Sequence, residues 1–316
     1  MPIVVNSNAS ATAASFNLSS ANDALRKSLE RLSSGKKINS SADDAGGLAV
    51  AYKLDSRINR TSALIQNSQN ALSFLQVQDS ALSTVGSIVD RMAELRTMAQ
   101  DITKNTGDIE NYTKEFLELQ SQLSQIRNEK FNGISLFAVS GSTTSGGLQG
   151  GSGSYVNESG TSLTTSIFSR TLTTHVSADS TLGSVSINVV NFQFMLSVSS
   201  STVDLAGIHG TTGTGYTDNS FIDDILAVSI SDFTEIIGRV ADMRAENGAE
   251  QNSIMNTISL LQSNMVNLES AHGRIMDTDI AVESTRFARH NILVQASASM
   301  TAQANQLSSV ALSLIG

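Results

Sequence analysis

The sequence predicts a mainly α-helical protein, with long antiparallel, coiled-coil-like helices formed by the N- and C-terminal regions and a small β-rich insert at the centre. Three observations lead to this fold class. Apolar residues recur every three or four positions in both halves of the chain, as along one face of a helix. The single proline of the 316 residues is Pro2, so no later proline interrupts a helix. Ser, Thr and Gly dominate the middle of the chain.

The first predicted helix has a narrow apolar seam. Leu18, Leu25 and Leu32 lie seven residues apart, and Ala21 and Ser28 fall between them. This spacing is typical of a coiled coil, and it is narrower than the apolar face of a helix in a globular core.

Two polar breaks punctuate the ends of the chain. Gly35 follows the first helix and suits the left-handed conformation that ends many helices. Ser41, with Asp44 three residues later, predicts a capping box at the start of the second helix. A second break, GRIMDTD, contains Asp277 and Asp279, and Glu283 completes this acidic group. We interpret the carboxylates of both breaks as helix caps, with acid pairs or metal ligands as the alternative.

Two further helical runs follow the first break. The second run extends from Leu54 to Ile102 with a period close to 3.5 residues, and Asn105 to Asp108 end it. The third run, Ile109 to Ile126, alternates steps of three and four, so we expect it to fold back as an antiparallel partner. FNG at Phe131–Gly133 then predicts a tight turn.

The insert covers residues 139–220, where more than half of the residues are Ser, Thr or Gly. Its segment from Val185 to Ser199 is β-prone, and disorder is the competing interpretation for Ser140–Gly160. Helical periodicity returns after Ser220, which has Asp223 as a capping partner, and a final amphipathic run ends near Leu314.

These patterns divide the chain into three parts, and we expect the outermost one to need partners. An isolated helix of this length is marginal in water. Pairing of the two ends would still leave small residues such as Ala21, Ala298 and Ala302 exposed, so we expect termini that become ordered only on polymerisation with other copies. The parts are terminal helices over 1–44 and 272–316, a helical rod over 45–138 and 221–271, and the insert over 139–220.

Composition argues against several functions. The absence of cysteine excludes disulfides, thiolate zinc sites and cysteine nucleophiles. A net charge of −9 with scattered Lys and Arg argues against nucleic-acid binding. No apolar run has the length of a membrane span, and the N-terminal stretch lacks the pattern of a cleavable signal peptide. The four histidines show no metal-binding spacing, so we expect no cofactor, no metal and no enzymatic activity.

The two breaks carry a family resemblance. The first resembles the N-terminal signature of bacterial flagellins over Glu30–Ala49, ERLSSGKKINSSADDAGGLA. The second resembles their C-terminal signature through GRIMDTDIAVESTRFARHNILVQASASMTAQANQ, and FNG falls where flagellins have it. The likeness covers residues 1–137 and 221–316. One departure is Leu307-Ser308-Ser309, where many flagellins continue ANQ with a proline–glutamine pair.

The resemblance implies a secreted structural protein that self-assembles into the filament of the bacterial flagellum, outside the cell, and serves swimming motility. It implies type III export without a cleavable signal peptide. It places the terminal helices in the inner core of the helical polymer, where they pack as coiled coils between subunits, and the insert at the surface. The expected core residues are Leu18, Ala21, Leu25, Leu32, Ile280, Phe287, Val294, Leu307 and Leu314. The expected spoke between the layers consists of Ser33, Gly35, Asn39, Asp43, Asp44, Asp277 and Asp279.

The same resemblance implies partners. They are copies of the chain itself, the flagellar export apparatus, an export chaperone at the C-terminal segment, and the filament cap and hook-junction proteins. A patch that a vertebrate Toll-like receptor recognises in flagellins is partly matched by Arg91, Glu94 and Leu95, and by Glu115 if a one-residue gap is allowed. Whether that receptor is activated stays open.

Two alternatives to the filament subunit stay open on the sequence alone. One is a hook-associated junction protein, and the other, from a different class, is a helical signalling hairpin. The sequence leaves undecided the handedness of the filament, the arrangement of its protofilaments, the co-assembly of other flagellins and the sites of glycosylation.

Overall fold

The structure is a computed structural model that describes residues 8–138, 149–156, 162–176, 183–197, 205, 222 and 224–315. Helices predominate, which confirms the predicted fold class. They are α1 (Ala9–Ser34), α2 (Ala45–Ala99), α3 (Thr106–Arg127), the short α4 (Phe192–Met195), α5 (Ile230–Met276) and α6 (Ile280–Ile315), with a 3₁₀ turn η1 at Ile225–Ala227. The strands are β1 (Lys130–Phe131), β2 (Ile134–Ser135), β3 (Gln149–Val156), β4 (Ser162–Thr173) and β5 (Ser184–Val189).

The chain forms two compact units. Unit 1 combines the two ends of the chain, Met1–Arg60 and Asn264–Gly316, and contains α1 and α6. Unit 2 is Thr61–Ser263 and contains α3, the strands and most of α2 and α5.

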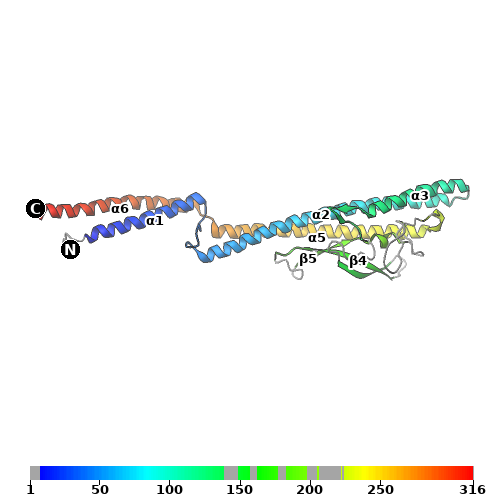
Figure 1. Ribbon diagram of the computed structural model, residues 1–316, viewed down its shortest axis with the longest axis horizontal. Coiled ribbons are helices and arrows are strands. Elements are labelled where there is room, and N and C mark those ends of the chain that lie inside the picture. Colours follow the sequence, from blue (N-terminus) through cyan, green and yellow to red (C-terminus); the bar gives the residue numbers. More distant parts are fainter. Residues whose placement is uncertain are drawn as a thin grey trace. The chain divides into compact units, whose positions relative to one another are not determined.

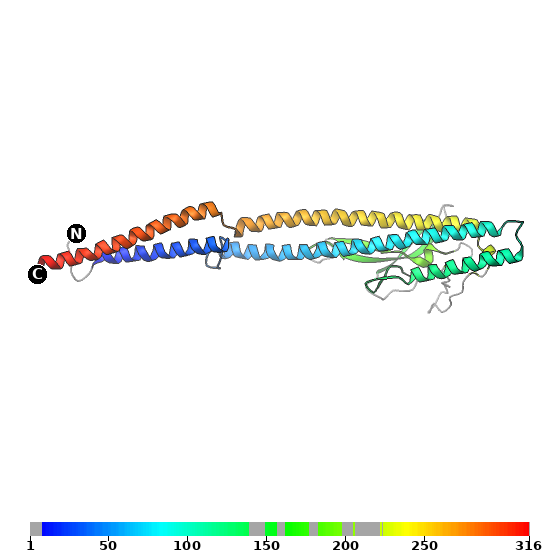
Figure 2. The same cartoon turned by 90° about the horizontal axis from the view of Figure 1, so that it is seen from above.

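The core of unit 2 lies between three helices. In Figures 1 and 2, α3 runs back alongside α2, and α5 lies along the same helix. The ring of Phe116 on α3 meets that of Phe233 on α5 edge to face, with centroids 6.4 Å apart. Fully buried side chains from the three helices include Leu75, Leu82, Val85, Val89, Met92, Leu95, Phe116, Leu123, Phe233, Ile236 and Ile254. Each contributes about 2 kcal/mol by leaving water, and the predicted return of α3 is confirmed.

The second helix ends earlier than its apolar pattern predicted. It stops at Ala99, and Ile102 is 98% exposed. The Asp101 carboxylate accepts the N–H of Thr103, so a local turn replaces further helix. Asn105 and Asp108 then cap α3 reciprocally.

The predicted turn at FNG is confirmed. Asn132 and Gly133 both have positive φ, at 49° and 78°, and they join β1 to β2 in an antiparallel hairpin. Positive φ at both central residues defines the type I′ turn, which Asn-Gly favours.

The insert contains a three-stranded antiparallel sheet in the order β3-β4-β5. This confirms its β-rich character, and β3 forms within the segment for which disorder competed. The β-prone stretch from Val185 changes at Asn191, whose side chain accepts the N–H of Phe194 and starts α4. Residues 198 and 199 of that stretch lie outside the described part of the chain.

The described helices after the insert start later than Ser220, where the sequence predicted a start. Ser220 and Asp223 lie outside the described residues, and the next elements are η1, capped by Asp224, and then α5 from Ile230. Ser229 and Asp232 exchange side-chain to backbone hydrogen bonds at the start of α5, so the capping pair lies nine residues further on.

A buried carboxylate ties the sheet to α5. The N–H of Asn188 on β5 donates to Glu250 Oε1 at 2.8 Å, whereas Oε2 is buried without a hydrogen-bond partner. Burial raises the pKa of Glu250 from its ordinary 4.5 to about 7. The Asn188 bond opposes this rise, and repulsion by Glu246 adds to it.

The stability of unit 2 is therefore predicted to fall as the pH rises. Glu250 is protonated in both states below about pH 4.5 and costs nothing there, but above about pH 7 the folded state must hold a charge that it disfavours. We expect Glu250→Gln to equal the parent in stability at pH 4 and to exceed it at pH 8 by on the order of 2 kcal/mol, measured by urea unfolding.

Glu246→Gln serves as the matched control for this prediction. It removes one like charge near Glu250 and leaves the tie to Asn188 in place, so a smaller gain at pH 8 is expected. An unchanged pH dependence in Glu250→Gln would contradict the assignment.

Candidate assembly surface at the paired chain ends

The two ends of the chain pair along strict heptad seams. Figures 1 and 2 both show α1 and α6 side by side and antiparallel, and the side chain of Asn8 donates to Ala304 O at 2.8 Å near their ends. Steps of three and four residues separate the buried and half-buried positions. These are Ala11, Ala14, Leu18, Ala21, Leu25, Ser28 and Leu32 on α1, with Ala24 and Arg31 half-buried beside them, and Glu283, Phe287, His290, Val294, Ser297, Thr301 and Ala304 on α6.

The seam brings together most of the predicted core residues. Ala21 is only 8% exposed, so the expectation that pairing of the ends would leave it in water is wrong. Ala298 and Ala302 are exposed as expected. Ile280 lies outside the seam at 65% exposure, and the side chains of Leu307 and Leu314 lie outside the described residues.

The two polar breaks bind each other. Gly35 has φ of 69°, which confirms its predicted left-handed conformation. Its carbonyl accepts the N–H of Thr278 at 2.9 Å, and the N–H of Lys37 donates to Met276 O at 2.6 Å. This short antiparallel bridge was not predicted from the sequence. The similar distance of the two breaks from their chain ends is the signal that could have indicated it.

The first break is ordered by its carboxylates. Asp44 caps α2 by accepting the N–H of Gly47 at 2.8 Å, so the predicted box with Ser41 is wrong although Asp44 is a cap. Asp43 instead accepts the N–H groups of Asn39 and Ser40 at 3.2 Å. Ser33, another predicted spoke residue, is exposed.

Asp43 also pairs with α1. Its carboxylate meets the Lys27 ammonium at 2.5 Å. The hydrogen bond from Lys27 is the main cause that lowers the pKa of Asp43 from its ordinary 3.8 to about 2, and the two backbone N–H groups add to the effect.

The second break uses its acidic residues differently. Asp279 caps α6 by accepting the N–H groups of Ala281 and Val282, at 2.9 and 3.1 Å, which confirms the capping interpretation there. Asp277 forms the bridge to Lys36 through its backbone. Glu283 lies in the seam with 4% of its side chain exposed, so it is not a cap.

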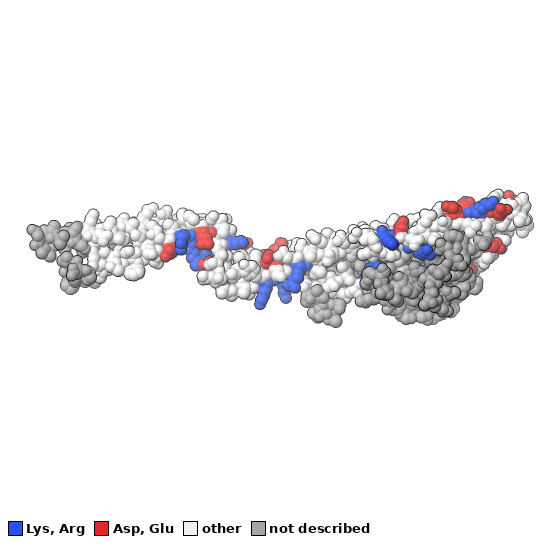
Figure 3. Space-filling model, in the orientation of Figure 1, with Lys and Arg blue, Asp and Glu red and all other residues white. Residues whose placement is uncertain are grey.

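The outer face of the pair, meaning its exposed surface toward the chain ends, is uncharged. No charged residue occurs between 8 and 22 or between 291 and 315, and Figure 3 shows this end of unit 1 without acidic or basic side chains on the visible face. Large apolar side chains are nevertheless exposed there. They lie outside the heptad positions, so the heptad pattern in the sequence did not predict them. They are Phe16 (71%), Ile292 (66%), Leu293 (45%) and Met300 (65%).

The residues of the predicted receptor patch divide in the structure. Arg91 pairs with Glu94 at 2.9 Å and with Glu115 at 2.8 Å, so the structure brings three of the four together on an exposed surface. Leu95 is fully buried in the core of unit 2 and does not join them.

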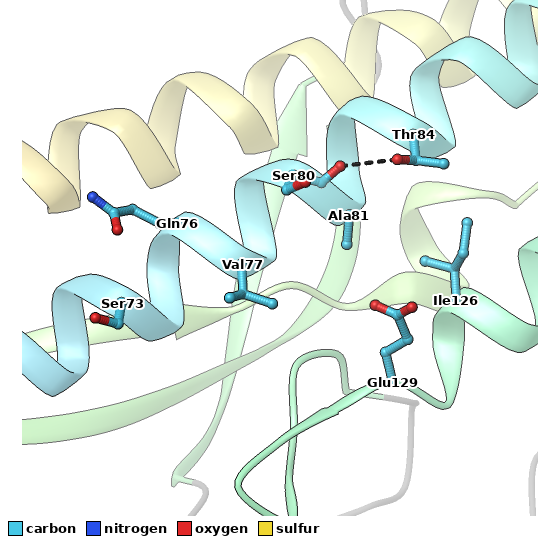
Figure 4. A pocket seen from close by; sticks show the side chains of 8 residues that line it. All are labelled: Ser73, Gln76, Val77, Ser80, Ala81, Thr84, Ile126 and Glu129. Atoms are coloured by element: carbon cyan, nitrogen blue, oxygen red, sulfur yellow. Dashed lines mark hydrogen bonds between the residues drawn. The ribbon is translucent and has the colours of Figure 1, made fainter.

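A hollow of about 430 Å³ lies on unit 2 between α2 and the end of α3 (Figure 4). Its lining consists of Ser73, Gln76, Val77, Ser80, Ala81, Thr84, Ile126 and Glu129. The Thr84 hydroxyl donates a hydrogen bond to the Ser80 carbonyl. The lining contains no histidine that could activate a hydroxyl, so it holds no activated nucleophile.

The described residues offer neither a metal site nor a membrane-spanning helix. Within the described ranges, His, Asp and Glu form no group of three that could hold a metal ion. Across that same part of the chain, none of the helices is both long enough and apolar enough for a membrane span.

The low pKa of Asp43 predicts that the first polar break, between α1 and α2, loses stability in acid. A carboxyl with a lower pKa in the folded state contributes its full stability above about pH 4 and loses it as the pH falls toward 2. We expect Asp43→Asn to be less stable than the parent at pH 6, and the difference to vanish near pH 2, in thermal melts followed by circular dichroism. Lys27→Met is the paired control and should converge in the same range, whereas a constant difference down to pH 2 would contradict the prediction.

Comparisons with known proteins agree with this arrangement. The family described as bacterial flagellin N-terminal helical region matches residues 5–142, and bacterial flagellin C-terminal helical region matches residues 230–315. The chain is 31% identical to flagellin of Bacillus subtilis over 96% of each chain, and 30% identical to flagellin of Halalkalibacterium halodurans over 92% of this chain and 91% of that one. It is 28% identical to the flagellar filament 33 kDa core protein of Treponema phagedenis over 99% of this chain and all of that one.

These matches favour neither a hook-junction protein nor a signalling hairpin. Both helical regions lie in the family's order, and the matched relatives align over nearly their whole length. The chain therefore belongs to the bacterial flagellins, and it is a structural subunit of a flagellar filament and not an enzyme.

Proposed function

We propose that the α1–α6 pair is the polymerising element, which packs against the same pair of neighbouring subunits in the inner core of the filament. One observation carries this proposal. The two paired ends lack charged residues and yet expose Phe16, Ile292 and Met300 by more than half. An exposed apolar face of this kind is typical of a protein–protein interface. Copies of the same pair would cover it, since they present equally uncharged and apolar surfaces.

The division of labour along the chain follows from that placement. In this proposal the terminal helices over 1–44 and 272–316 form the inner core. The bridged breaks act as the spoke, the helices over 45–138 and 221–271 form the rod, and the insert over 139–220 faces outward. The hydrogen-bonded carboxylates of the breaks support the spoke assignment, because a connecting segment outside the helices must satisfy its backbone groups with polar side chains.

Delivery and capping by other flagellar proteins complete the proposal. The chain has no cysteine and no proline after Pro2, which suits passage through the flagellar type III export apparatus in an unfolded state. The apolar face of α6 would need cover before assembly, which supports a chaperone at the C-terminal segment. The filament cap and hook-junction proteins would meet the same terminal helices at the two ends of the filament.

Seeded polymerisation tests the assembly role. Soluble chain mixed with short filament fragments should grow into long helical tubes, seen by electron microscopy and measured by sedimentation. A chain that stays monomeric, or that stops at closed dimers at every concentration and salt condition, would contradict the proposal.

Substitutions on the outer face should separate assembly from folding. Ile292→Asp places a carboxylate on the proposed interface, where burial costs several kcal/mol, so we expect the critical concentration for assembly to rise at least about a hundredfold. Because Ile292 is 66% exposed in the single chain, the thermal unfolding of the soluble subunit should not change.

Two further variants serve as comparisons. Ile102→Asp makes the same chemical change at a residue that is 98% exposed in unit 2, and it should assemble like the parent. Leu25→Asp disrupts the seam within the chain, so it should block assembly while unit 2 stays folded. Normal filaments from Ile292→Asp would refute the outer face as the contact surface.

A further inference from the structure

The seam between α1 and α6 specifies its own register weakly. Small side chains such as Ala14, Ala21 and Ala304 repeat along it, so a slide by one heptad would again place apolar residues opposite each other. The backbone bonds at the breaks anchor the pair at one end only, and the 26-residue α1 extends away from them. Polar side chains in the seam are the groups that can distinguish one register from another.

Two polar side-chain atoms at the pair, one on each helix, are buried without a hydrogen-bond partner. Glu283 has 4% of its side chain exposed, and its Oε1 is buried with no hydrogen-bond partner, while Oε2 accepts from Arg286 at 3.3 Å. On the opposite helix, Arg31 Nε is also buried with no partner. A buried acceptor and a buried donor of opposite charge each carry a large cost when they stay unpaired.

The bridge at the breaks places Arg31 and Glu283 at similar heights along the axis of the helix pair. Thr278 donates to the carbonyl of Gly35 at the bridge. Arg31 lies four residues before Gly35 on α1, and Glu283 lies five residues after Thr278 on α6. Arg31 is about 6 Å from Gly35 along α1, and Glu283 is at most about 11 Å from Thr278, because Thr278 and Asp279 precede α6 and can rise by about 3.3 Å each. The two levels therefore differ by at most about 5 Å, which these long side chains and one water molecule can span.

Both side chains also lie on the face of their helix that is turned toward the other helix, or beside that face. Glu283 is a seam residue, and Arg31 precedes the seam residue Leu32, one turn after the buried Ser28.

We propose that Arg31 and Glu283 form an ion pair across the α1–α6 seam, bridged by one water molecule, which fixes the register of the two terminal helices. The water accepts the Nε–H of Arg31 and donates to Glu283 Oε1, which satisfies both groups. The first turn of α6 also favours a charged carboxylate at Glu283. This inference rests on the filament role, since it says how the proposed polymerising element is set in one arrangement.

A slide by one heptad removes this pairing. It moves Arg31 Nε and Glu283 Oε1 apart by about 10 Å and leaves these two buried atoms without a partner, so the displaced arrangement is disfavoured. Arg31 and Glu283 are therefore positioning residues. Their effect on assembly comes through the outer face, because displaced helices would present Phe16 and Ile292 at the wrong relative heights.

A register assay tests the pair directly. The chain has no cysteine, so two engineered cysteines give a clean cross-link. Ala14→Cys with Ser297→Cys reports the register of the structure, and Ala14→Cys with Ala304→Cys reports a displacement by one heptad. Cross-links within one chain are separated from those between chains on non-reducing gels, for both the soluble chain and seeded filaments.

Replacing the pair separates register from stability. Arg31→Met with Glu283→Leu fills the site with apolar groups, so the soluble chain should stay folded, but the preference for the in-register cross-link should fall from at least about tenfold to near one and filaments should grow more slowly. The exchanged pair, Arg31→Glu with Glu283→Arg, should restore the preference that either single exchange loses. Arg26→Met removes an exposed cation from the same helix and should change nothing, since its guanidinium is 82% exposed.

The outcomes separate this inference from the function on which it rests. A full in-register preference in the apolar double variant, no recovery in the exchanged pair, or no cross-link in either register would overturn the pair. In-register cross-links in a chain that never grows filaments would support the pair and would count against the polymerising role.

Discussion

The backbone bridge between the two polar breaks is the interaction on which unit 1 depends. Two peptide hydrogen bonds, from Thr278 to Gly35 and from Lys37 to Met276, join segments from opposite ends of the chain. They start α1 and α6 on an antiparallel path, and the small residues of the seam then let the helices pack. Without the bridge, each terminal helix would have to be stable on a seam too narrow for a helix alone in water.

That seam explains how the two helices can pair within one chain and still leave large apolar side chains uncovered. Its inner positions bury Ala21, Ser28 and the polar side chain of Glu283, which give little apolar stabilisation and set a precise path. Other large apolar residues, Phe16 and Ile292 among them, remain on the outside. The hydrophobic contribution that an ordinary domain keeps for its own core is therefore available to contacts between subunits.

Unit 2 follows a different design. Its helices share a wide core of Leu, Val, Ile and Phe, to which the insert adds Ile187, Phe192 and Met195 among other apolar residues. Polar contacts also hold the insert. Glu250 holds β5 by one backbone bond, while the fully buried Arg239 donates to the carbonyls of Phe194 and Ser197, both at 2.8 Å. The insert is therefore held to the helices both by buried apolar side chains and by hydrogen bonds to its backbone.

The sequence by itself determined the helices, the glycine end of α1, the Asn-Gly hairpin and the heptad residues Leu18, Leu25 and Leu32, because each depends on local conformation or on a repeating side-chain pattern. It did not determine the ends of α2 and α5, where local turns at Asp101 and Ser229 competed with helix. Only the tertiary structure decided which residues lie level across α1 and α6, that the breaks bridge, and that Leu95 is buried. Those facts depend on contacts between segments far apart in the chain. A periodic apolar pattern shows which face of a helix is packed, but it does not identify the segment that packs against it.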